Sequence, residues 1–362
     1  MNALAQEIAA LIAQEGPITL ERYMELCLQH PRYGYYLARD PFGAGGDFVT
    51  APEISQMFGE LIGLWMTEAF ALAGRPRAAR LVELGPGRGT LMADALRAAR
   101  VAPEFLSAIE VDLVETSPRL RERQRQALAN AAPKVSWRDS FAEVPRGPLF
   151  VVANEFFDAL PARHFVRTPQ GWRERLIGLD AAGALRFGLA PEIEVALHVE
   201  AEEGSIIEVN AAAQRLLTEI AGRVARDGGV MLVIDYGYTE TSLGESLQAV
   251  AKHAYVDPLE SPGEADLTTH VDFAALSRAA RAAGAKVFGP TTQGEFLSQL
   301  GIARRAETLS RRATPQQRAE IDAALRRLIG TGDAREVMGE LFKALAVAHP
   351  ALPEPPGFGR EG

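Results

Sequence analysis

The stretch from Arg80 to Leu91 constrains the fold most, because it joins a short apolar run, a glycine-rich turn and a helical pattern. A strand, a glycine turn and a helix in that order let an α/β sheet present backbone N–H groups and a helix N-terminus to a bound cofactor. The glycines are spaced Gly85-x-Gly87-x-Gly89, so the stretch lacks the G-x-G-x-x-G pattern of a dinucleotide site. An ordinary strand–helix connection is the alternative interpretation.

The acidic residue before this turn narrows the choice of cofactor. Glu83 lies two residues before the first glycine. A dinucleotide needs the turn free to approach its pyrophosphate, whereas a carboxylate at this position suits a cationic amino group. We therefore predict S-adenosyl-L-methionine rather than NAD as the cofactor.

The composition excludes several classes of protein. At 362 residues the chain can hold one large domain, or a domain with a substantial insertion. Its formal net charge of −9 argues against a broad nucleic-acid surface, so we predict no nucleic-acid partner. The single cysteine, Cys27, excludes an internal disulfide and fits a reducing compartment. No apolar run approaches the roughly 20 residues that span a bilayer. Residues 1–15 lack the basic region of a targeting signal. We expect no membrane span and a cytoplasmic location.

The pattern along the chain predicts an α/β protein. Its core is a Rossmann-like sheet, with N-terminal helices, a β-hairpin insertion and a helical C-terminal part. Short alternating runs split by glycine and aspartate are typical of antiparallel strands and indicate the insertion. We predict four parts: a helical region with a glycine-rich lid at 1–75, a Rossmann-like cofactor-binding domain at 76–165 and 205–290, a β-rich insertion at 166–204, and a helical region with a flexible tail at 291–362.

Polar or acidic residues stand at the ends of four predicted parallel strands. They are Glu83, Glu115, Asn154 with Glu155, and Asp235. In an open parallel sheet the ligand lies beyond the carboxyl ends of the strands, so we expect these side chains to surround it. Glu115 follows the glycine turn by about 30 residues, near the spacing at which a carboxylate accepts hydrogen bonds from ribose hydroxyls.

The segment that begins at Asn154 predicts a second half of the site. Two carboxylates, Glu155 and Asp158, flank Phe156 and Phe157 directly after a buried strand. Acidic groups pair with a cation and aromatic faces attract it, so this segment suits a cationic acceptor. In the alternative interpretation the two phenylalanines belong to the core and Asp158 is a turn former.

Two further residues have open assignments. Asp139 follows the third predicted strand and is placed to accept a hydrogen bond from an adenine amino group, or else to act as a helix cap or turn residue. His270, with Asp272, is a candidate for proton or substrate contact, and a structural histidine at a loop–helix junction is the alternative. The other histidines show no metal-ligand spacing, so we predict no metal.

Six blocks of sequence together resemble the MidA family. The blocks cover residues 46–56, 83–89, 115–118, 154–161, 235–237 and 266–273. The resemblance extends over roughly residues 16–345 and implies a class I S-adenosyl-L-methionine-dependent methyltransferase, here a bacterial member. It also implies a protein arginine methyltransferase, because the mitochondrial member has that activity and assists the assembly of respiratory complex I. Residues 168–203 carry no block that we recognise.

The resemblance implies roles for individual residues. Glu155 matches by position the first acid of the two-glutamate loop in arginine methyltransferases, so it would orient the guanidinium with help from Asp158 or Asp235. The predicted cofactor-binding residues are Glu83, Gly85, Pro86, Gly87, Gly89, Glu115, Thr116, Asp139, Ser140 and Asn154. The predicted substrate and lid residues are Asp47, Phe48, Thr50, Glu53, Phe156, Tyr236 and His270.

The resemblance also implies a protein as the substrate, with a 49-kDa-type subunit of complex I as the candidate, and a homo-oligomer is compatible with the sequence. Three alternatives stay open. The first is a non-catalytic, cofactor-binding assembly factor. The second is a methyltransferase for a small molecule or nucleic acid, and the third is an NAD-dependent oxidoreductase.

Overall fold

The computed structural model describes residues 1–38, 50–333 and 336–359, which form two compact units. The division falls within helix α9 (Ala211–Asp227). The four-part division expected from the sequence stays a prediction beside these units. The hairpin unit is drawn from Met1–Phe48, Asp158–Arg215 and Glu240–His270, and the sheet unit from Val49–Phe157, Leu216–Thr239 and Val271–Gly362.

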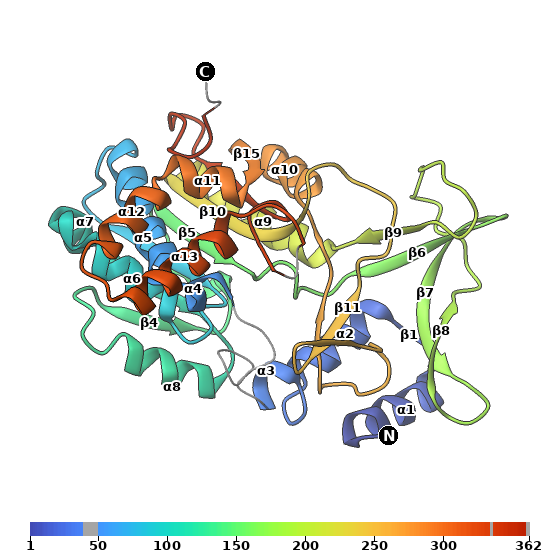
Figure 1. The fold of residues 1–362 in the computed structure, drawn as a ribbon. Helices are drawn as coiled ribbons and strands as arrows, with labels where there is room; N and C mark the ends of the chain where they lie inside the picture. The colour runs from blue at the N-terminus through green and yellow to red at the C-terminus, as the bar shows by residue number, and fades with distance from the viewer. Residues whose placement is uncertain (39–49, 334–335, 360–362) are drawn as a thin grey trace. The chain divides into compact units, whose positions relative to one another are not determined.

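One eight-stranded sheet organises the sheet unit (Figure 1), and its strands are β2 (Ala79–Leu84), β3 (Ile109–Val114), β4 (Val135–Arg138), β5 (Leu149–Asn154), β10 (Gly229–Tyr238), β14 (Val271–Asp272), β15 (Lys286–Thr292) and β16 (Phe342–Ala348). The strand order is β15-β16-β10-β5-β2-β3-β4, with β14 paired to β10. The five neighbouring strands β10, β5, β2, β3 and β4 run parallel, whereas β16 is antiparallel to both β10 and β15. Chain order reverses around β2, which is where open α/β sheets bind ligands.

The central strands are continuous apolar runs. Every residue of β5 is buried, and so are the first seven residues of β10. Strands buried on both faces read as unbroken runs of valine, isoleucine and leucine rather than as alternating patterns. This burial fixes the positions of the polar residues at the strand ends.

The helices of the sheet unit enclose an apolar core, and they are α4 (Ala51–Ile54), α5 (Gln56–Leu72), η1 (Ala99–Val101), α6 (Thr90–Ala98), α7 (Pro103–Ala108), α8 (Pro118–Ala127), η2 (Phe141–Glu143), α10 (Phe273–Ala282), α11 (Gln293–Gln299), α12 (Ile302–Ser310) and α13 (Pro315–Ile329). α5 and α6 pack at very short range, because a Cβ atom on Gly63 would lie 2.4 Å from the carbonyl oxygen of Ala95. Gly59 makes a similar approach to Asp94 one turn earlier. The helix that follows the glycine turn is therefore held rigidly against α5.

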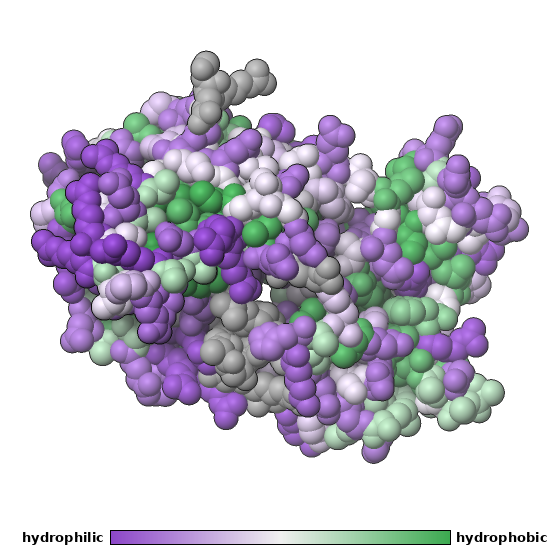
Figure 2. All heavy atoms as spheres, viewed as in Figure 1, coloured by the Kyte–Doolittle hydropathy of each residue, from purple (hydrophilic) through white to green (hydrophobic). Residues whose placement is uncertain are grey.

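The hairpin unit combines two small sheets with N-terminal helices, and its elements are α1 (Ala3–Glu15), β1 (Ile18–Thr19), α2 (Leu20–Gln29), α3 (Tyr35–Ala38), β6 (Arg163–Thr168), β7 (Gly171–Leu179), β8 (Leu185–Leu189), β9 (Ile206–Val209), β11 (Gln248–Ala251), β12 (Ala254–Val256) and β13 (Asp266–Thr268). A five-stranded antiparallel sheet has the order β1-β7-β6-β9, with β8 on β7. The other sheet has the order β12-β11-β13. Hydrophobic and hydrophilic side chains mingle on the surface that carries β6 to β9 (Figure 2).

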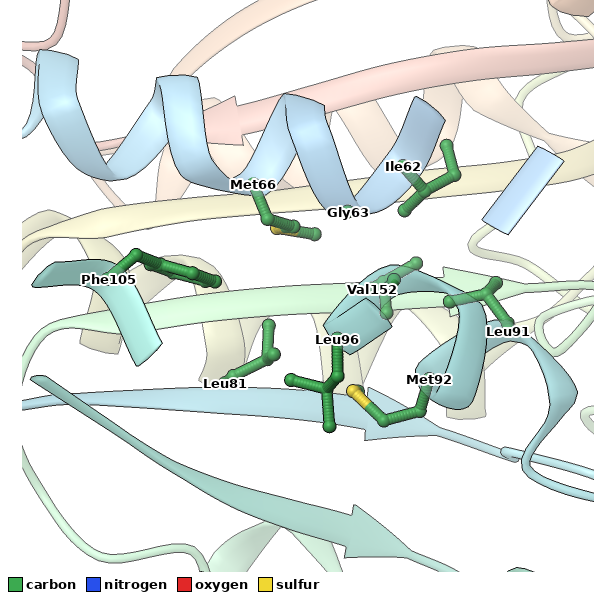
Figure 3. A pocket seen from close by; sticks show the side chains of 10 residues that line it. Ile62, Gly63, Met66, Leu81, Leu91, Met92, Leu96, Phe105 and Val152 are labelled. Carbon is green, nitrogen blue, oxygen red and sulfur yellow. The ribbon is translucent and has the colours of Figure 1, made fainter. Parts of the chain in front are cut away.

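An apolar pocket lies in the core of the sheet unit (Figure 3). It is lined by side chains from α5, α6, α7, β2 and β5, among them Met66, Leu96, Phe105, Leu81 and Val152. These side chains offer no polar group to a ligand. The pocket is therefore a packing gap of the core and not the cofactor site.

Three elements differ from the expectations of the sequence. β16 is a buried strand inside the region that we expected to be helical. β10 continues through Asp235 to Tyr238, so Asp235 lies within the strand and not after it. Within the helical region expected at 1–75, the backbone is extended at Ser55, which caps α5 by accepting a hydrogen bond from Met57 N. In each case the pairing or capping partner is supplied by the fold.

Candidate active site

The glycine turn joins β2 to α6 in a conformation that favours glycine. Gly85, Gly87 and Gly89 have φ of +61°, +52° and +84°, in the left-handed region that side chains rarely adopt. Gly85 also permits a close approach, because a Cβ atom there would lie 2.7 Å from Cδ2 of Phe156. Pro86 completes the turn by accepting a hydrogen bond from Gly89 N at 2.7 Å. The turn therefore leads from the end of β2 directly into the N-terminus of α6.

Glu83 is a buried carboxylate with an unsatisfied oxygen. Its side chain is 3 % exposed, and its Oε2 atom has no hydrogen-bond partner among the residues that the structure describes. Burial raises the pKa of this carboxyl to about 8. Leaving such a group without a partner costs free energy, so the position favours a ligand that brings a donor.

Glu115 and its neighbours connect the next strand end to the turn. The carboxylate accepts hydrogen bonds from Ser117 N at 2.8 Å and from Gln124 Nε2 at 3.3 Å. Gln124 Nε2 also donates to the carbonyl of Gly87 at 2.7 Å. Burial raises the pKa of Glu115, although these hydrogen bonds oppose the shift. Thr116, beside it, is exposed.

Gln124 is a residue that the sequence analysis missed. It is fully buried on α8, and its Oε1 atom accepts a hydrogen bond from Trp137 Nε1 at 2.8 Å. Its position four residues after the buried Leu120 puts both on the same helix face, which was the available signal. Gln124 therefore links α8, β4 and the glycine turn.

Asp139 lies at the surface after β4. Its side chain is 71 % exposed and lies 2.5 Å from Arg121 Nη2. Arg121 also donates through Nε to the carbonyl of Glu115 at 2.7 Å. Ser140, next to Asp139, is exposed as well. Asp139 is thus tethered near the end of β3, and its contact with adenine stays a prediction.

Glu155 follows β5 with an unusual backbone conformation. Its φ of +50° is rare for a residue other than glycine and is found where the surrounding structure enforces strain, often at functional sites. Its Oε1 atom accepts hydrogen bonds from Ala51 N at 2.9 Å and from Asn154 Nδ2 at 3.0 Å. The Oδ1 atom of Asn154 is buried without a hydrogen-bond partner in the described part of the chain. Glu155 is therefore fixed beside the start of α4.

Asp235 organises the loop that contains Glu155. This fully buried carboxylate accepts hydrogen bonds from Phe156 N at 3.1 Å, from Phe157 N at 2.9 Å and from Tyr236 N at 3.0 Å. The two phenylalanine rings meet edge to face at 5.5 Å. The Tyr236 ring packs against Phe342. Asp235 thus holds the backbone of Phe156 and Phe157 against β10.

The glycine turn is also tied to α4. Glu53 Oε1 accepts a hydrogen bond from Thr90 Oγ1 at 2.5 Å, at the first residue of α6. Thr50 precedes α4 at its N-cap without a side-chain capping bond. Asp47 and Phe48, expected in the lid, lie outside the described residues.

Asp158 and His270 belong to the hairpin unit. Asp158 is buried, and its carbonyl accepts a hydrogen bond from Thr269 N at 3.0 Å. Burial, followed by the charges of Asp266 and Asp158, raises the pKa of the Tyr36 phenol well above its ordinary value. His270 N donates to Ser246 Oγ at 2.8 Å. The roles of Asp158 and His270 in substrate contact stay predictions.

Comparison with known proteins agrees with this geometry. A family model described as "Putative S-adenosyl-L-methionine-dependent methyltransferase" matches residues 61–291. The chain belongs to this methyltransferase family. The predicted family, the class I fold, the methyltransferase activity and the S-adenosyl-L-methionine cofactor are therefore confirmed.

Relatives of this methyltransferase carry more specific names. "Protein arginine methyltransferase NDUFAF7, mitochondrial" of Danio rerio is 37% identical over 97% of the chain and 88% of the relative. The protein of the same name from Homo sapiens is 40% identical over 82% of the chain and 73% of the relative. A COG1565 superfamily member from Burkholderia thailandensis, solved with bound S-adenosyl-homocysteine, matches with a TM-score of 0.86 and 31% identity. That match covers 99% of the methyltransferase and 95% of the solved chain.

A membrane span was not expected for this methyltransferase. Within residues 1–38, 50–333 and 336–359, no helix is both long enough and apolar enough to cross a membrane.

Proposed function

We propose that the methyltransferase modifies an arginine side chain of a protein substrate. The observation that carries the proposal is the carboxylate of Glu155, held in a strained turn directly after β5 and beside the glycine turn through Phe156. The names of the relatives, which specify arginine methylation, support the same acceptor. A carboxylate in a fixed orientation is the group that pairs best with a planar guanidinium.

The strand ends provide the groups that the cofactor requires. We assign the unsatisfied Oε2 of Glu83 to the amino group of the methionine moiety, because this donor would remove the penalty of its burial. We assign Glu115 to the ribose hydroxyls and Asp139 to the adenine amino group. We assign the left-handed turn at Gly85, Gly87 and Gly89, which carries no Cβ atom at these three positions, to the backbone against which the ligand lies.

Glu155 would act on the acceptor arginine. The bound cofactor supplies an electrophilic methyl group on a sulfonium. A guanidinium is charged at physiological pH and is a poor nucleophile, so the nitrogen that gains the methyl group must lose a proton. Glu155 fixes the plane of the guanidinium, draws its positive charge away from the reacting nitrogen and accepts that proton. The methyl carbon would leave its sulfur as the bond to nitrogen forms, with the neutral thioether as the leaving group, and residues that hold the guanidinium in one orientation would supply much of the remaining acceleration.

Asp235 is assigned as a positioning residue. Its carboxylate accepts hydrogen bonds from the backbone N–H groups of Phe156 and Phe157, and so it keeps the strained turn at Glu155 in place. Asp158 remains a candidate for substrate contact. We also propose a 49-kDa-type subunit of respiratory complex I as the protein substrate, following the family resemblance.

A methylation assay tests the proposal. The purified enzyme, cofactor labelled in the methyl group and a recombinant 49-kDa-type complex I subunit should yield labelled arginine. Glu155→Gln should lower kcat by about 10²–10⁴-fold, because the amide keeps the shape but cannot pair with a cation or accept the proton. Glu104→Gln, an exposed glutamate on α7 of the same unit, serves as the matched control.

Two outcomes would count against the proposal. The absence of label on arginine, with cofactor binding intact, would favour a non-catalytic role or another acceptor. Equal kcat values for Glu155→Gln and the wild-type enzyme would remove Glu155 from the reaction. Cofactor affinity, measured by calorimetry, should be unchanged in Glu155→Gln, since no cofactor contact is assigned to this carboxylate.

A further inference from the structure

The segment between β8 and β9 of the hairpin unit has an unusual composition. Residues 189–204 contain no lysine or arginine. We call this segment the acidic strip, because its glutamates are Glu192, Glu194, Glu200, Glu202 and Glu203. Residues 189–203 of the strip belong to the region 168–203, which carries no sequence block that we recognise.

The acidic strip is anchored to β7 although it is neither helix nor strand over most of its length. Ala190 N donates to the carbonyl of Glu174, and Glu194 N to that of Trp172, both at 2.8 Å. The buried Trp172 ring returns a hydrogen bond from Nε1 to the carbonyl of Val199 at 2.9 Å. Its partly buried side chains, Leu197 and Ala201, pack on the small core formed by Phe165, Trp172 and Ile207. The backbone of the strip is thus held at several points.

The same strip presents aliphatic side chains to solvent. Leu189 is 44% exposed, Ile193 42%, Val195 77% and Val199 39%. Figure 2 shows hydrophobic side chains among hydrophilic ones on the surface that carries β6 to β9. Four exposed aliphatic side chains within one anchored segment, bordered by glutamates, are typical of a surface that another molecule covers.

We propose that the acidic strip is the docking surface for a basic segment of the protein substrate. This inference rests on the proposed function, since it names how the protein that carries the target arginine is held. The aliphatic stems of lysine and arginine side chains would lie on Val195 and Val199, while their charges pair with the surrounding glutamates. Electrostatic complementarity of this kind selects the partner and speeds its association.

The charge of the strip favours a basic substrate over a second copy of the enzyme as its binding partner. The strip carries only acidic charged groups, and the whole chain has a formal net charge of −9. Two strips placed face to face would bring like charges together, which is unfavourable. A basic partner gains from the same charges.

Two sets of substitutions test the docking surface. The first is Val195→Ser with Val199→Ser, and the second is Glu200→Gln, Glu202→Gln and Glu203→Gln together. Val101→Ser is the matched control, because Val101 is 76% exposed on the sheet unit and Val195 is 77% exposed. The two substrates are the recombinant 49-kDa-type subunit and a short peptide that contains only its methylated arginine and immediate neighbours.

Each set should raise KM for the whole subunit by about 5–20-fold and leave kcat unchanged, because docking is lost while the reacting groups stay intact. KM for the short peptide should not change. The glutamate variant should also lose much of the salt dependence of binding. Circular dichroism and thermal melting of each variant establish that it is folded.

The possible failures are distinguishable. Unchanged KM for the whole subunit in both variants would overturn the docking surface while the proposed function stands. If the wild-type enzyme methylates neither substrate, the proposed function fails, and calorimetric binding of the subunit then decides: binding that both variants weaken supports the strip, and unchanged or absent binding overturns it. A dimer in sedimentation that the valine variant dissociates would assign the strip to self-association and also overturn the proposal.

Discussion

Each unit contains a glutamate whose side chain is shielded from solvent, and the two glutamates differ in their hydrogen-bond partners. In the hairpin unit, Glu208 on β9 lies 2.8 Å from Nε2 of His164 and accepts hydrogen bonds from both N and Oγ of Ser246. In the sheet unit, Glu83 on β2 has a buried oxygen without a partner among the described residues. Burial would raise both pKa values, but the partners of Glu208 outweigh burial and lower its pKa, whereas the pKa of Glu83 rises to about 8.

In our proposal, this difference distinguishes a structural carboxylate, Glu208, from one that pairs with the cofactor, Glu83. Glu208 joins β9 to β6 through His164 and to the loop at Ser246, which in turn accepts a hydrogen bond from His270 N. Both carboxylate oxygens of Glu208 have partners within the hairpin unit. Glu83 stands at the end of a central parallel strand, where a sheet of this topology binds its ligand. We therefore propose that Glu83 pairs with the cofactor, whereas Glu208 stabilises the hairpin unit.

The largest effect on stability should come from removing Glu208, whose two carboxylate oxygens both have partners. Glu208→Ala leaves the fully buried His164 without its carboxylate, so we expect a loss of about 3–5 kcal/mol in the free energy of unfolding at neutral pH. Ser246→Ala removes the two hydrogen bonds of the Ser246 hydroxyl, to Glu208 and from His270 N, but keeps the His164 pair, so it should cost about 1–2 kcal/mol. Urea denaturation measures both. Equal losses in the two variants would show that the His164 pair contributes nothing special.

The pH dependence of the Glu208 pair has a definite sign. Its folded-state pKa lies below the ordinary value of 4.5, so its stabilisation is present above pH 4.5 and is lost as the pH falls through the lowered pKa. The difference in unfolding free energy between the wild-type protein and Glu208→Ala should therefore become smaller in acid. A constant difference from the wild-type protein down to pH 2 would contradict this account.

Removing the ionisable group of Glu83 should have the opposite effect and stabilise the cofactor-free protein. The folded-state pKa of Glu83, about 8, exceeds its ordinary value of 4.5, so its stabilising contribution is full below pH 4.5 and is lost as the pH rises to 8. In the cofactor-free protein, Glu83→Gln should therefore raise the free energy of unfolding at pH 8 by about 2–4 kcal/mol and change it little at pH 4.5. Urea midpoints across this range measure the effect.

The same substitution should weaken cofactor binding. An amide cannot pair with the charged amino group, so we expect the Kd for S-adenosyl-L-methionine to rise about 10–100-fold. Glu104→Gln is the control in the same unit. A variant that is more stable and yet binds the cofactor normally would separate the unsatisfied oxygen from ligand recognition, and the comparison between the two glutamates would fail.

A pair of glycines sharpens the comparison further. Gly85 and Gly183 have φ of +61° and +79°, but a Cβ atom would approach Phe156 only at Gly85, and nothing lies within 4 Å at Gly183. Each alanine variant should lose about 1 kcal/mol of stability from backbone strain. Gly85→Ala should lose more and should also weaken cofactor binding. Differential scanning calorimetry with and without cofactor distinguishes them, and identical behaviour would deny the turn a special role.

The sequence predicts the part of the site that is local. A glycine turn after an apolar run, and acids directly after such runs, follow from the chemistry of a few neighbouring residues, so Glu83 and Glu115 are found at the expected strand ends. Partners that are distant in sequence are not found this way. The link from Gln124 to Gly87 joins residues 37 positions apart, and a glutamine in a charged helix gives little sign of it.

The missed strand has a related cause. Residues 342–348 contain three alanines and a leucine, and both residue types favour helix when considered alone. In the structure β16 is inserted between β10 and β15, and most of its residues are fully buried. Tertiary pairing overrides local propensity here. It also extends β10 beyond the expected end, because Asp235 is paired with Lys343.

The smallest expected effect concerns the predicted adenine contact. Asp139→Ala removes an exposed ion pair with Arg121, which is worth about 0–1 kcal/mol, so stability should barely change. If the carboxylate accepts a hydrogen bond from the adenine amino group, the Kd for S-adenosyl-L-methionine should rise about 3–10-fold. Binding of an analogue without the amino group should be equally weak in both proteins. Arg121→Ala is the informative control, because it breaks the ion pair, together with the hydrogen bond from Arg121 to the carbonyl of Glu115, and keeps the Asp139 carboxylate. If Kd rises by the same amount in Arg121→Ala, the ion pair between Arg121 and Asp139 matters for binding only because it holds the loop in place. If Kd changes in neither variant, Asp139 has no role in cofactor binding.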